Sequence, residues 1–236
     1  MLAKDIMTTN VVTVAPDTSI ETISQLMITH NVSGLPVVGA SGDVLGIVTE
    51  GDLILRQQTE SKDSRLSSWW LRLLSDRKTN AADYIKLHGT RADEVMTRDV
   101  VTVGEDTPVG DIARVLAEKR VKRVPVVRGG QLVGIVSRIN LLRGLATRQD
   151  SGDASPTPDD RAIKQKILDE VEAQGWVTHG SLNVIVTGGV VELWGWIESE
   201  KERHVLLLLA KGVDGVDSVV RSEEHTSELQ SPCNLV

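Results

Sequence analysis

The chain has 236 residues, of which 40% are hydrophobic and 25% charged, and its formal net charge is −7. This composition is that of an ordinary globular protein and allows one large domain or two small ones. The acidic balance argues against a nucleic-acid-binding protein, which normally carries a basic face. One cysteine excludes an internal disulfide framework, and no apolar stretch approaches the ~18 residues of a membrane-spanning helix. Because no signal-peptide pattern opens the sequence, we expect a cytoplasmic protein.

An internal repeat organises the first part of the sequence. Residues 5–54 and 94–142 align almost throughout, with a single one-residue gap in the turn before Val44 and Leu132. The elements expected in the first copy are a strand over 11–14, an amphipathic helix capped by Asp17 or Thr18, strands over 35–38 and 44–48, and a second helix from Thr49. The second copy repeats this β-α-β-β-α pattern with a strand over 100–103, a helix capped by Asp106 or Thr107, and a second helix from Ser137. So small a sheet cannot bury its apolar face alone, so the two copies should pack into one domain.

Three motifs recur in both copies: an M-T-x-x-V-V-T-V opening, an L/V-P-V-V run and a G-I-V-[TS] ending. On these motifs the first part of the chain resembles the CBS domain, named after cystathionine β-synthase, in its tandem form. The resemblance implies an α/β (α+β) fold with a pseudo-twofold axis, no obligatory cofactor, and an adenosyl regulatory ligand (AMP, ADP, ATP or S-adenosylmethionine). It also implies a homodimer. The boundaries expected from the sequence are 1–57 and 91–148 for the two copies, with a helical insert over 58–90.

The run Gly46–Asp52 matches the ribose-phosphate signature of the family, in which a strand leads into a helix N-terminus. Free N–H groups and the helix dipole favour a phosphate there, which the Thr49 hydroxyl can also bind, while the Asp52 carboxylate can accept from ribose hydroxyls. The adenine is expected beside Val12 and the Leu35-Pro36-Val37 run. The same Thr-x-x-Asp spacing also caps a helix, and spacing alone favours that reading. The resemblance reverses the preference.

The second copy keeps the hydroxyl of Ser137 but has Asn140 where the family has an aspartate. Since a neutral amide offers one acceptor oxygen, ribose binding is expected to be weaker there. The residues of this copy that match the adenine-flanking positions are Val101, Val124, Pro125 and Val126. This copy is also more basic, with Lys119, Arg120, Lys122, Arg123 and Arg138. These cations either lie on solvated helix ends or reach a polyphosphate in the cleft, with Arg123 and Arg138 the best candidates.

After a linker over 149–159, residues 160–220 follow an α-β-β-α-β order and resemble the BON domain, a small module often proposed to contact phospholipid or large partners. Period-two alternation places Val191 and Leu193 under the helices and Trp194 and Trp196 on the other face, which we expect to be open. Docking of this face on the CBS pair or on a second protomer is favoured over a membrane surface, because the domain is acidic.

Two further segments carry expectations of their own. The 58–90 insert has apolar residues on one helical stripe, which favours a helix covering the CBS core or the dimer contact over a partner-docking or membrane-surface helix. Residues 221–236 match the translation of a common short-read sequencing adapter, and we expect an assembly artefact.

The sequence contains no nucleophile elbow, P-loop or metal-ligand spacing, so we do not expect an enzyme. Two functions are left. In the first, the CBS pair senses an adenosyl ligand and changes how the BON domain is presented. In the second, the clefts are vestigial and the protein is a dimeric adaptor. A ribose-dependent affinity would separate the two.

Overall fold

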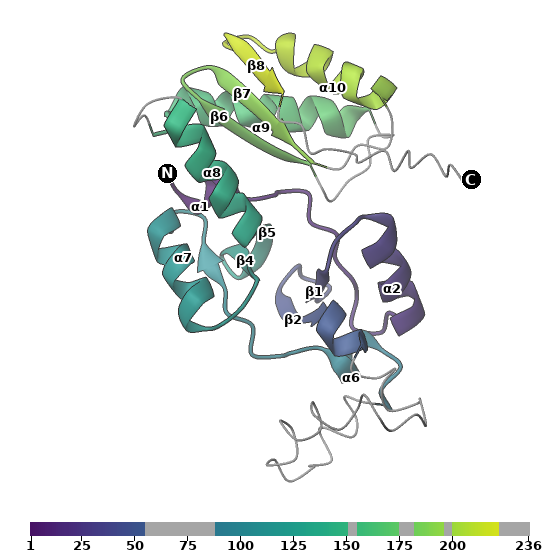
Figure 1. Cartoon of the computed structure of the whole chain (residues 1–236). Helices are drawn as coiled ribbons and strands as arrows, with labels where there is room; N and C mark the ends of the chain where they lie inside the picture. The colour runs from purple at the N-terminus through teal and green to yellow at the C-terminus, as the bar shows by residue number, and fades with distance from the viewer. Residues whose placement is uncertain (55–87, 151–154, 175–181, 196–199, 222–236) are drawn as a thin grey trace, which may run out of the picture.

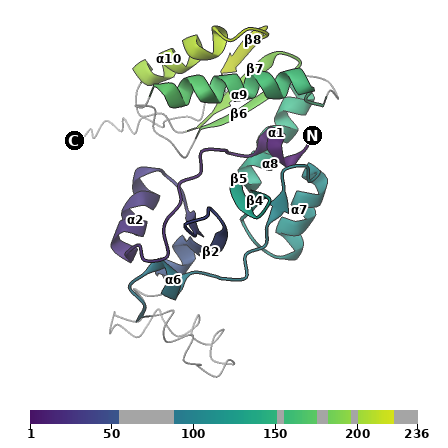
Figure 2. The ribbon, with the colours of Figure 1, turned by 180° about the vertical axis from the view of Figure 1, so that it is seen from behind.

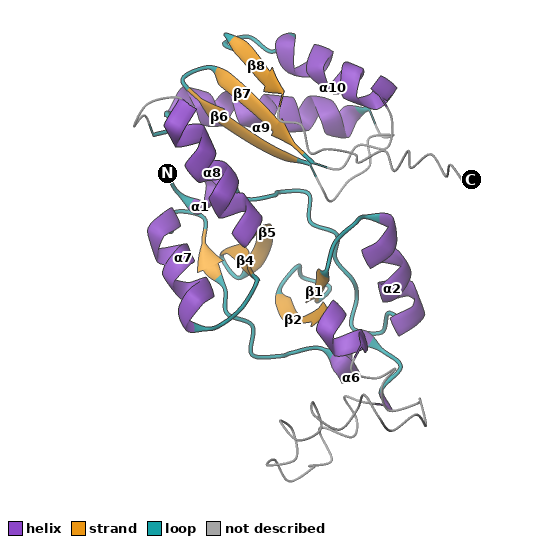
Figure 3. Ribbon diagram, viewed as in Figure 1, coloured by secondary structure: helices purple, strands orange, loops and turns teal. Residues whose placement is uncertain are grey.

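The structure is a computed structural model that describes residues 1–54, 88–150, 155–174, 182–195 and 200–221. The predicted insert, Trp196 and the tail beyond Arg221 lie outside the described residues. Figure 1 shows the two copies of the repeat side by side, with the C-terminal domain resting on the second copy. Figure 3 shows both helices and strands in all three parts, as the mixed α/β prediction requires.

The first copy contains one long helix and a two-stranded antiparallel sheet. Its elements are α2 (Ile20–Thr29), β1 (Gly34–Val38) and β2 (Val44–Thr49). The predicted strand over 11–14 is wrong, because only Val14 of this segment pairs with the sheet, through a bridge to Val37. The predicted N-caps are also wrong: the side chain of Ser19 accepts from the Thr22 N–H and begins α2.

The second copy repeats this arrangement with a third, very short strand. Its elements are β3 (Val103–Gly104), α7 (Val109–Glu118), β4 (Arg123–Arg128), β5 (Gln131–Ser137) and α8 (Arg138–Asp150), with sheet order β3-β4-β5. The strand predicted over 100–103 is therefore displaced toward Gly104. Neither predicted cap begins α7, whose N-cap is Pro108 without a side-chain bond. The second helices begin one residue later than predicted, at Glu50 and Arg138, because Thr49 and Ser137 end the preceding strands.

The two copies exchange their opening segments. The short helix α1 (Ala3–Ile6) precedes the first copy but packs in the core of the second, and α6 (Ala92–Val95) precedes the second copy but packs in the core of the first. A bridge follows each helix: Thr8 pairs with Ile135 of β5, and Thr97 pairs with Ile47 of β2. The core of each copy is therefore completed by a helix from the start of the other copy, far away in the sequence, and the pair folds as one unit.

The C-terminal domain has the predicted α-β-β-α-β order. Its elements are α9 (Pro158–Ala173), β6 (Asn183–Thr187), β7 (Val190–Trp194), α10 (Glu200–Lys211) and β8 (Ser218–Arg221). The strands form one sheet in the order β6-β7-β8, and Figures 1 and 2 show α9 and α10 on the same face of it. Asp160 stabilises both the start of α9, through the Thr157 N–H at 2.8 Å, and the β6–β7 turn, through the Gly189 N–H at 2.9 Å. β8 includes Arg221, the first residue of the predicted artefact.

The second face of this sheet is covered by the repeat pair. Alternation along the strands is as predicted, with Val191 and Leu193 packing under the helices. The other face is not open: Ile185 is buried in the core of the second copy, and Trp194 packs against that core. Docking on the repeat pair, the favoured prediction for Trp194, is therefore what the structure shows.

Polar contacts at α1 join the repeat pair to the C-terminal domain. Arg161 of α9 donates to the buried Asp5 carboxylate at 2.7 Å, and the Lys164 ammonium donates to the carbonyl oxygens of Lys4 and Asp5 at 2.9 and 3.1 Å. Burial lowers the pKa of Lys164 to about 8, an effect that the nearby Asp5 charge opposes. Asn183 of β6 donates to the Ile6 carbonyl at 2.8 Å. The first six residues of the chain are thus shared between the second copy and the C-terminal domain.

Candidate ligand-binding cleft

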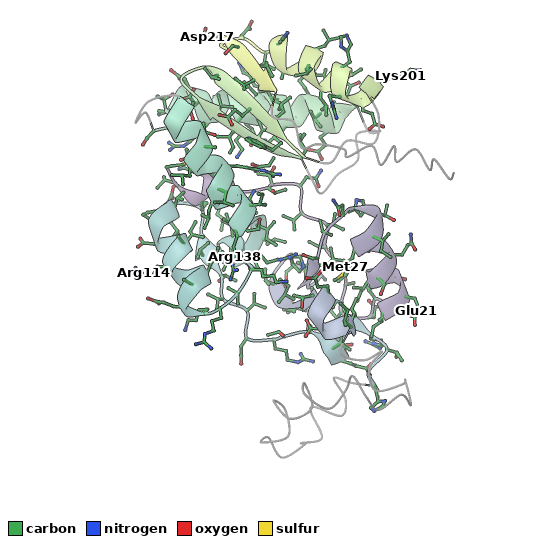
Figure 4. All side chains as sticks on the ribbon, viewed as in Figure 1. Glu21, Met27, Arg114, Arg138, Lys201 and Asp217 are labelled. Carbon is green, nitrogen blue, oxygen red and sulfur yellow. The ribbon has the colours of Figure 1, made fainter. Side chains whose placement is uncertain are left out.

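A cleft of about 440 Å³ opens between the two copies. Its wall on the first-copy side comes from the segment after α1 and from the loop between α2 and β1, and its wall on the second-copy side from the end of β5 and the start of α8. The lining residues are Thr8, Val11, Val12, Asn31, Val32, Ser33, Gly34, Leu35, Lys122, Arg123, Ile135, Ser137, Arg138, Ile139, Asn140, Arg143 and Gly195. Figure 4 shows the labelled Arg138 between the copies, whereas Arg114 lies on the outer side of α7.

Six of the predicted site residues line this cleft: Val12, Leu35, Arg123, Ser137, Arg138 and Asn140. The buried positions Pro36, Val37, Val124, Pro125 and Val126 support the sheets instead, and Val101 packs on the second core. Thr49 and Asp52 are not among the lining residues. The sequence grouped Val12 and Leu35 with Thr49 and Asp52, but the cleft groups them with Ser137 and Asn140. Val12 packs on the core of the first copy, to which Leu35 belongs, and the cleft lies between this copy and the start of α8 in the second copy.

The described lining residues carry four cations and no acid. Arg123 crosses from β4 to the first copy, donating to the Gly34 carbonyl at 3.1 Å and to the Ser33 hydroxyl. A Cβ at Gly34 would lie 2.8 Å from Arg123 Nη1, so glycine leaves room for this guanidinium. Burial lowers the pKa of Arg123 from its ordinary value, and the charge of Glu50 opposes this effect. A guanidinium remains cationic at neutral pH despite such a shift.

The remaining cations lie at the rim and at the inner end of the cleft. Lys122 forms an ion pair with Glu50 at 2.9 Å, and this hydrogen bond lowers the pKa of Glu50. Arg138 is exposed. Arg143, which the sequence analysis missed, is 8% exposed and lies at the inner end. Its position three residues after Asn140, on the same helix face, was the available signal.

In the first copy the signature residues bond to each other. Asp52 Oδ2 accepts from the Thr49 N–H at 2.9 Å and from the Thr49 hydroxyl at 2.7 Å. This is the capping arrangement that the spacing alone favoured. A contact between Asp52 and a ribose stays a prediction, and the bound ligand would have to share or replace these two hydrogen bonds.

The second signature repeats the cap and adds a buried anchor. Asn140 Oδ1 accepts from the Ser137 N–H at 2.8 Å and from its hydroxyl at 2.7 Å, while Nδ2 donates to the Ile6 carbonyl at 3.1 Å. The side chain is only 2% exposed. A carboxylate could not donate to Ile6, so the departure from the family's aspartate has a structural cause.

Comparison with known proteins identifies the family of the repeated part of the chain. The CBS domain family model matches residues 3–58 and 92–147. The uncharacterised protein MJ1426 of Methanocaldococcus jannaschii is 32% identical over 154 residues, which cover 61% of this chain and 91% of that protein. The chain belongs to the CBS domain family. The CBS domain-containing protein YhcV of Bacillus subtilis is 28% identical over 151 residues, covering 64% of this chain and 90% of that protein.

The C-terminal part of this CBS protein matches the BON domain model over residues 159–222. Among solved structures, the CBS-pair protein CBSX2 in complex with AMP is 27% identical, with a TM-score of 0.49, and covers 63% of this chain and 98% of that one. The two family-model matches show the CBS pair and the BON domain in the predicted order.

The CBS cleft reaches the BON domain at its inner end. Gly195, directly after β7, is one of the lining residues, and the guanidinium carbon of Arg143 lies 5.2 Å from the centre of the Trp194 ring. In the described ranges no group of three or more histidine, cysteine, aspartate or glutamate side chains is placed to hold a metal ion. None of the helices in those ranges combines the length and apolar character that crossing a membrane requires.

Proposed function

We propose that this protein is a regulatory binding protein whose CBS pair takes a phosphorylated adenosyl ligand and couples its occupancy to the BON domain. The observation that carries the proposal is the charge of the cleft: four cations and no acid line it within the described residues, beside apolar side chains. Apolar residues can flank an adenine, while arginines bind phosphate through paired N–H donors. Val12, Leu35 and Ile135 are the best candidates for the adenine side.

The charge also orders the candidate ligands. ATP and ADP gain attraction from several cations, whereas S-adenosylmethionine places a positively charged sulfonium among them. The start of α8 adds N–H groups at the same wall, which favour an anion. We therefore expect ATP and ADP to bind more tightly than AMP, and S-adenosylmethionine to bind least.

Replacing Arg138 by glutamine is expected to weaken ATP binding about fivefold to tenfold, because one of the charge-assisted contacts to phosphate is lost. AMP binding should change less. Calorimetric titration of the full chain with AMP, ADP, ATP and S-adenosylmethionine measures both effects. Arg114→Gln is the matched control, since Arg114 is an exposed cation on the outer side of α7. Equal affinities of wild type and Arg138→Gln for ATP would remove Arg138 from the site.

A dimeric adaptor with vestigial clefts is the second candidate function. The observation that favours it is that the polar side chains of each signature hydrogen-bond to each other, Thr49 with Asp52 and Ser137 with Asn140. In that case the wild-type chain binds none of the four ligands in the same titrations. Binding of any of them, weakened by added salt as expected for phosphate contacts, would exclude this candidate.

Both functions include a homodimer, for which α8 offers a surface. Leu142 and Leu145 are 60% and 55% exposed and lie three positions apart on one stripe of the helix. Ile139, which also lines the cleft, continues this stripe and is 46% exposed. Leu142→Glu is expected to convert a dimer into a monomer, because a charge would be buried in the contact. Sedimentation velocity measures the mass. A wild-type monomer, or an unchanged dimer in the variant, would contradict this surface.

A further inference from the structure

The wall between the cleft and the BON domain contains a cation and an aromatic ring that lie close together. Arg143 of α8 lies between the cleft, which it lines, and the ring of Trp194 at the end of β7. Its side chain is almost fully buried, so its guanidinium is not a solvated surface charge. Its guanidinium carbon lies over the ring at 5.2 Å from the ring centre, within the range of a favourable cation–π interaction.

The BON domain fixes the position of the ring in turn. Glu192, buried two residues earlier on the same face of β7, accepts from the indole N–H of Trp194 at 3.1 Å. The following residue, Gly195, reaches the cleft lining itself. A short chain of contacts therefore runs from the BON sheet through Trp194 to a cation inside the CBS cleft.

A cation–π contact and the binding of an anion are compatible for a guanidinium. The ring attracts the positive charge and takes up no N–H donor, so the donors can still bind a phosphate oxygen. A guanidinium held in place loses less conformational freedom when the anion arrives, so the ring should strengthen anion binding rather than compete with it.

We infer that Trp194 of the BON domain positions Arg143 to bind the anionic end of the cleft's ligand, so that the BON domain forms part of the binding site. The inference rests on the proposed function and adds the contacts through which the coupling acts. Ligand binding in the cleft and docking of the BON domain on the CBS pair should each stabilise the other. Because such coupling is reciprocal, the bound ligand should strengthen the contact between Arg143 and Trp194 by the same factor by which that contact strengthens ligand binding.

The test uses the full chain, ATP as the probe and calorimetry. Trp194→Leu, which keeps an apolar side chain but removes the ring, is expected to weaken ATP binding about fivefold. Arg143→Met, which keeps the apolar stem, is expected to weaken it at least as much. Leu208→Ala, an exposed position on α10 of the same domain, is the control and should leave the affinity unchanged.

The double variant decides whether Trp194 acts through Arg143. If it does, Trp194→Leu in the Arg143→Met background changes the affinity no further. Hydrogen exchange gives a second readout: ATP should slow the exchange of β7 amides in the wild type but not in Arg143→Met. Should Trp194→Leu fail to fold, Trp194→Phe keeps a weaker ring contact and is expected to show a smaller loss in the same direction.

The outcomes separate the inference from the proposed function. A wild-type chain that binds no ATP overturns both. A wild type that binds ATP, with Trp194→Leu binding equally well, leaves the function standing and overturns the inference. Multiplying losses in the double variant would also overturn it, because Trp194 would then affect the cleft without Arg143.

Discussion

Replacing Asp5 by alanine is expected to lower the free energy of unfolding by about 3 kcal/mol, because it breaks a buried ion pair and a helix cap together. The Asp5 carboxylate is bound by Arg161 at 2.7 Å and accepts from the Leu2 N–H at 2.7 Å. Its side chain is fully buried, whereas that of Arg161 is 31% exposed. The partial exposure of Arg161 keeps the expected loss at the lower end of the range for broken buried pairs.

Chemical unfolding followed by tryptophan fluorescence and far-UV circular dichroism measures this loss. Asp111→Ala is the matched control, since it removes a carboxylate from the exposed ion pair with Arg114, and its midpoint should equal that of the wild type. Asp5 joins the CBS pair to the BON domain, so its loss should allow the two parts to unfold separately. The unfolding midpoints from fluorescence and from circular dichroism are therefore expected to differ in the variant. Equal midpoints for Asp5→Ala and Asp111→Ala would show that the ion pair adds nothing.

The pH dependence supplies an independent check on the same contacts. Between pH 8 and the ordinary lysine pKa of 10.5, the unfolded chain holds a proton at Lys164 that the folded chain has released. The contribution of this group to stability therefore rises with pH over that window. The Asp5 charge stabilises only the protonated form of Lys164. The loss of unfolding free energy in Asp5→Ala, relative to the wild type, should therefore become smaller toward pH 10. A deficit independent of pH would contradict the coupling of Asp5 with Lys164.

Restoring the family's residue by Asn140→Asp is expected to destabilise the protein by about 2 kcal/mol, although the change adds a signature aspartate. The new carboxylate would be buried and would face the Ile6 carbonyl, to which the amide now donates at 3.1 Å. The cap to Ser137 would survive, because an aspartate oxygen can accept the same hydrogen bonds.

Asp52→Asn makes the reciprocal change in the first copy and is the matched control. An amide oxygen can keep the cap to Thr49, so the loss of stability should be smaller, under about 1 kcal/mol. Equilibrium unfolding measures both variants, and ATP titration follows in parallel. An Asn140→Asp protein as stable as the wild type, with tighter ATP binding, would support the ribose role and contradict the structural one.

Local elements and their inner faces could be predicted because short-range patterns encode them. The strands over 35–38 and 44–48, the α-β-β-α-β order of residues 160–220, and the alternation of Val191 and Leu193 against Trp194 all follow from periodicity and turn residues. The N-caps failed because several hydroxyl and carboxyl groups stand together before α2, and spacing does not decide which of them turns toward the first N–H groups.

The sequence by itself determined the repeat, the family, the order of elements and the presence of a basic second copy. Only the tertiary structure decided which halves of the two copies meet, because the exchange of α1 and α6 joins residues that lie far apart in the sequence, such as Thr8 with Ile135 and Thr97 with Ile47. It also decided that the Trp194 face is covered and that Asn140 anchors Ile6. These contacts join surfaces that meet only when separate units pack, and periodicity within one segment carries no information about its partner in space.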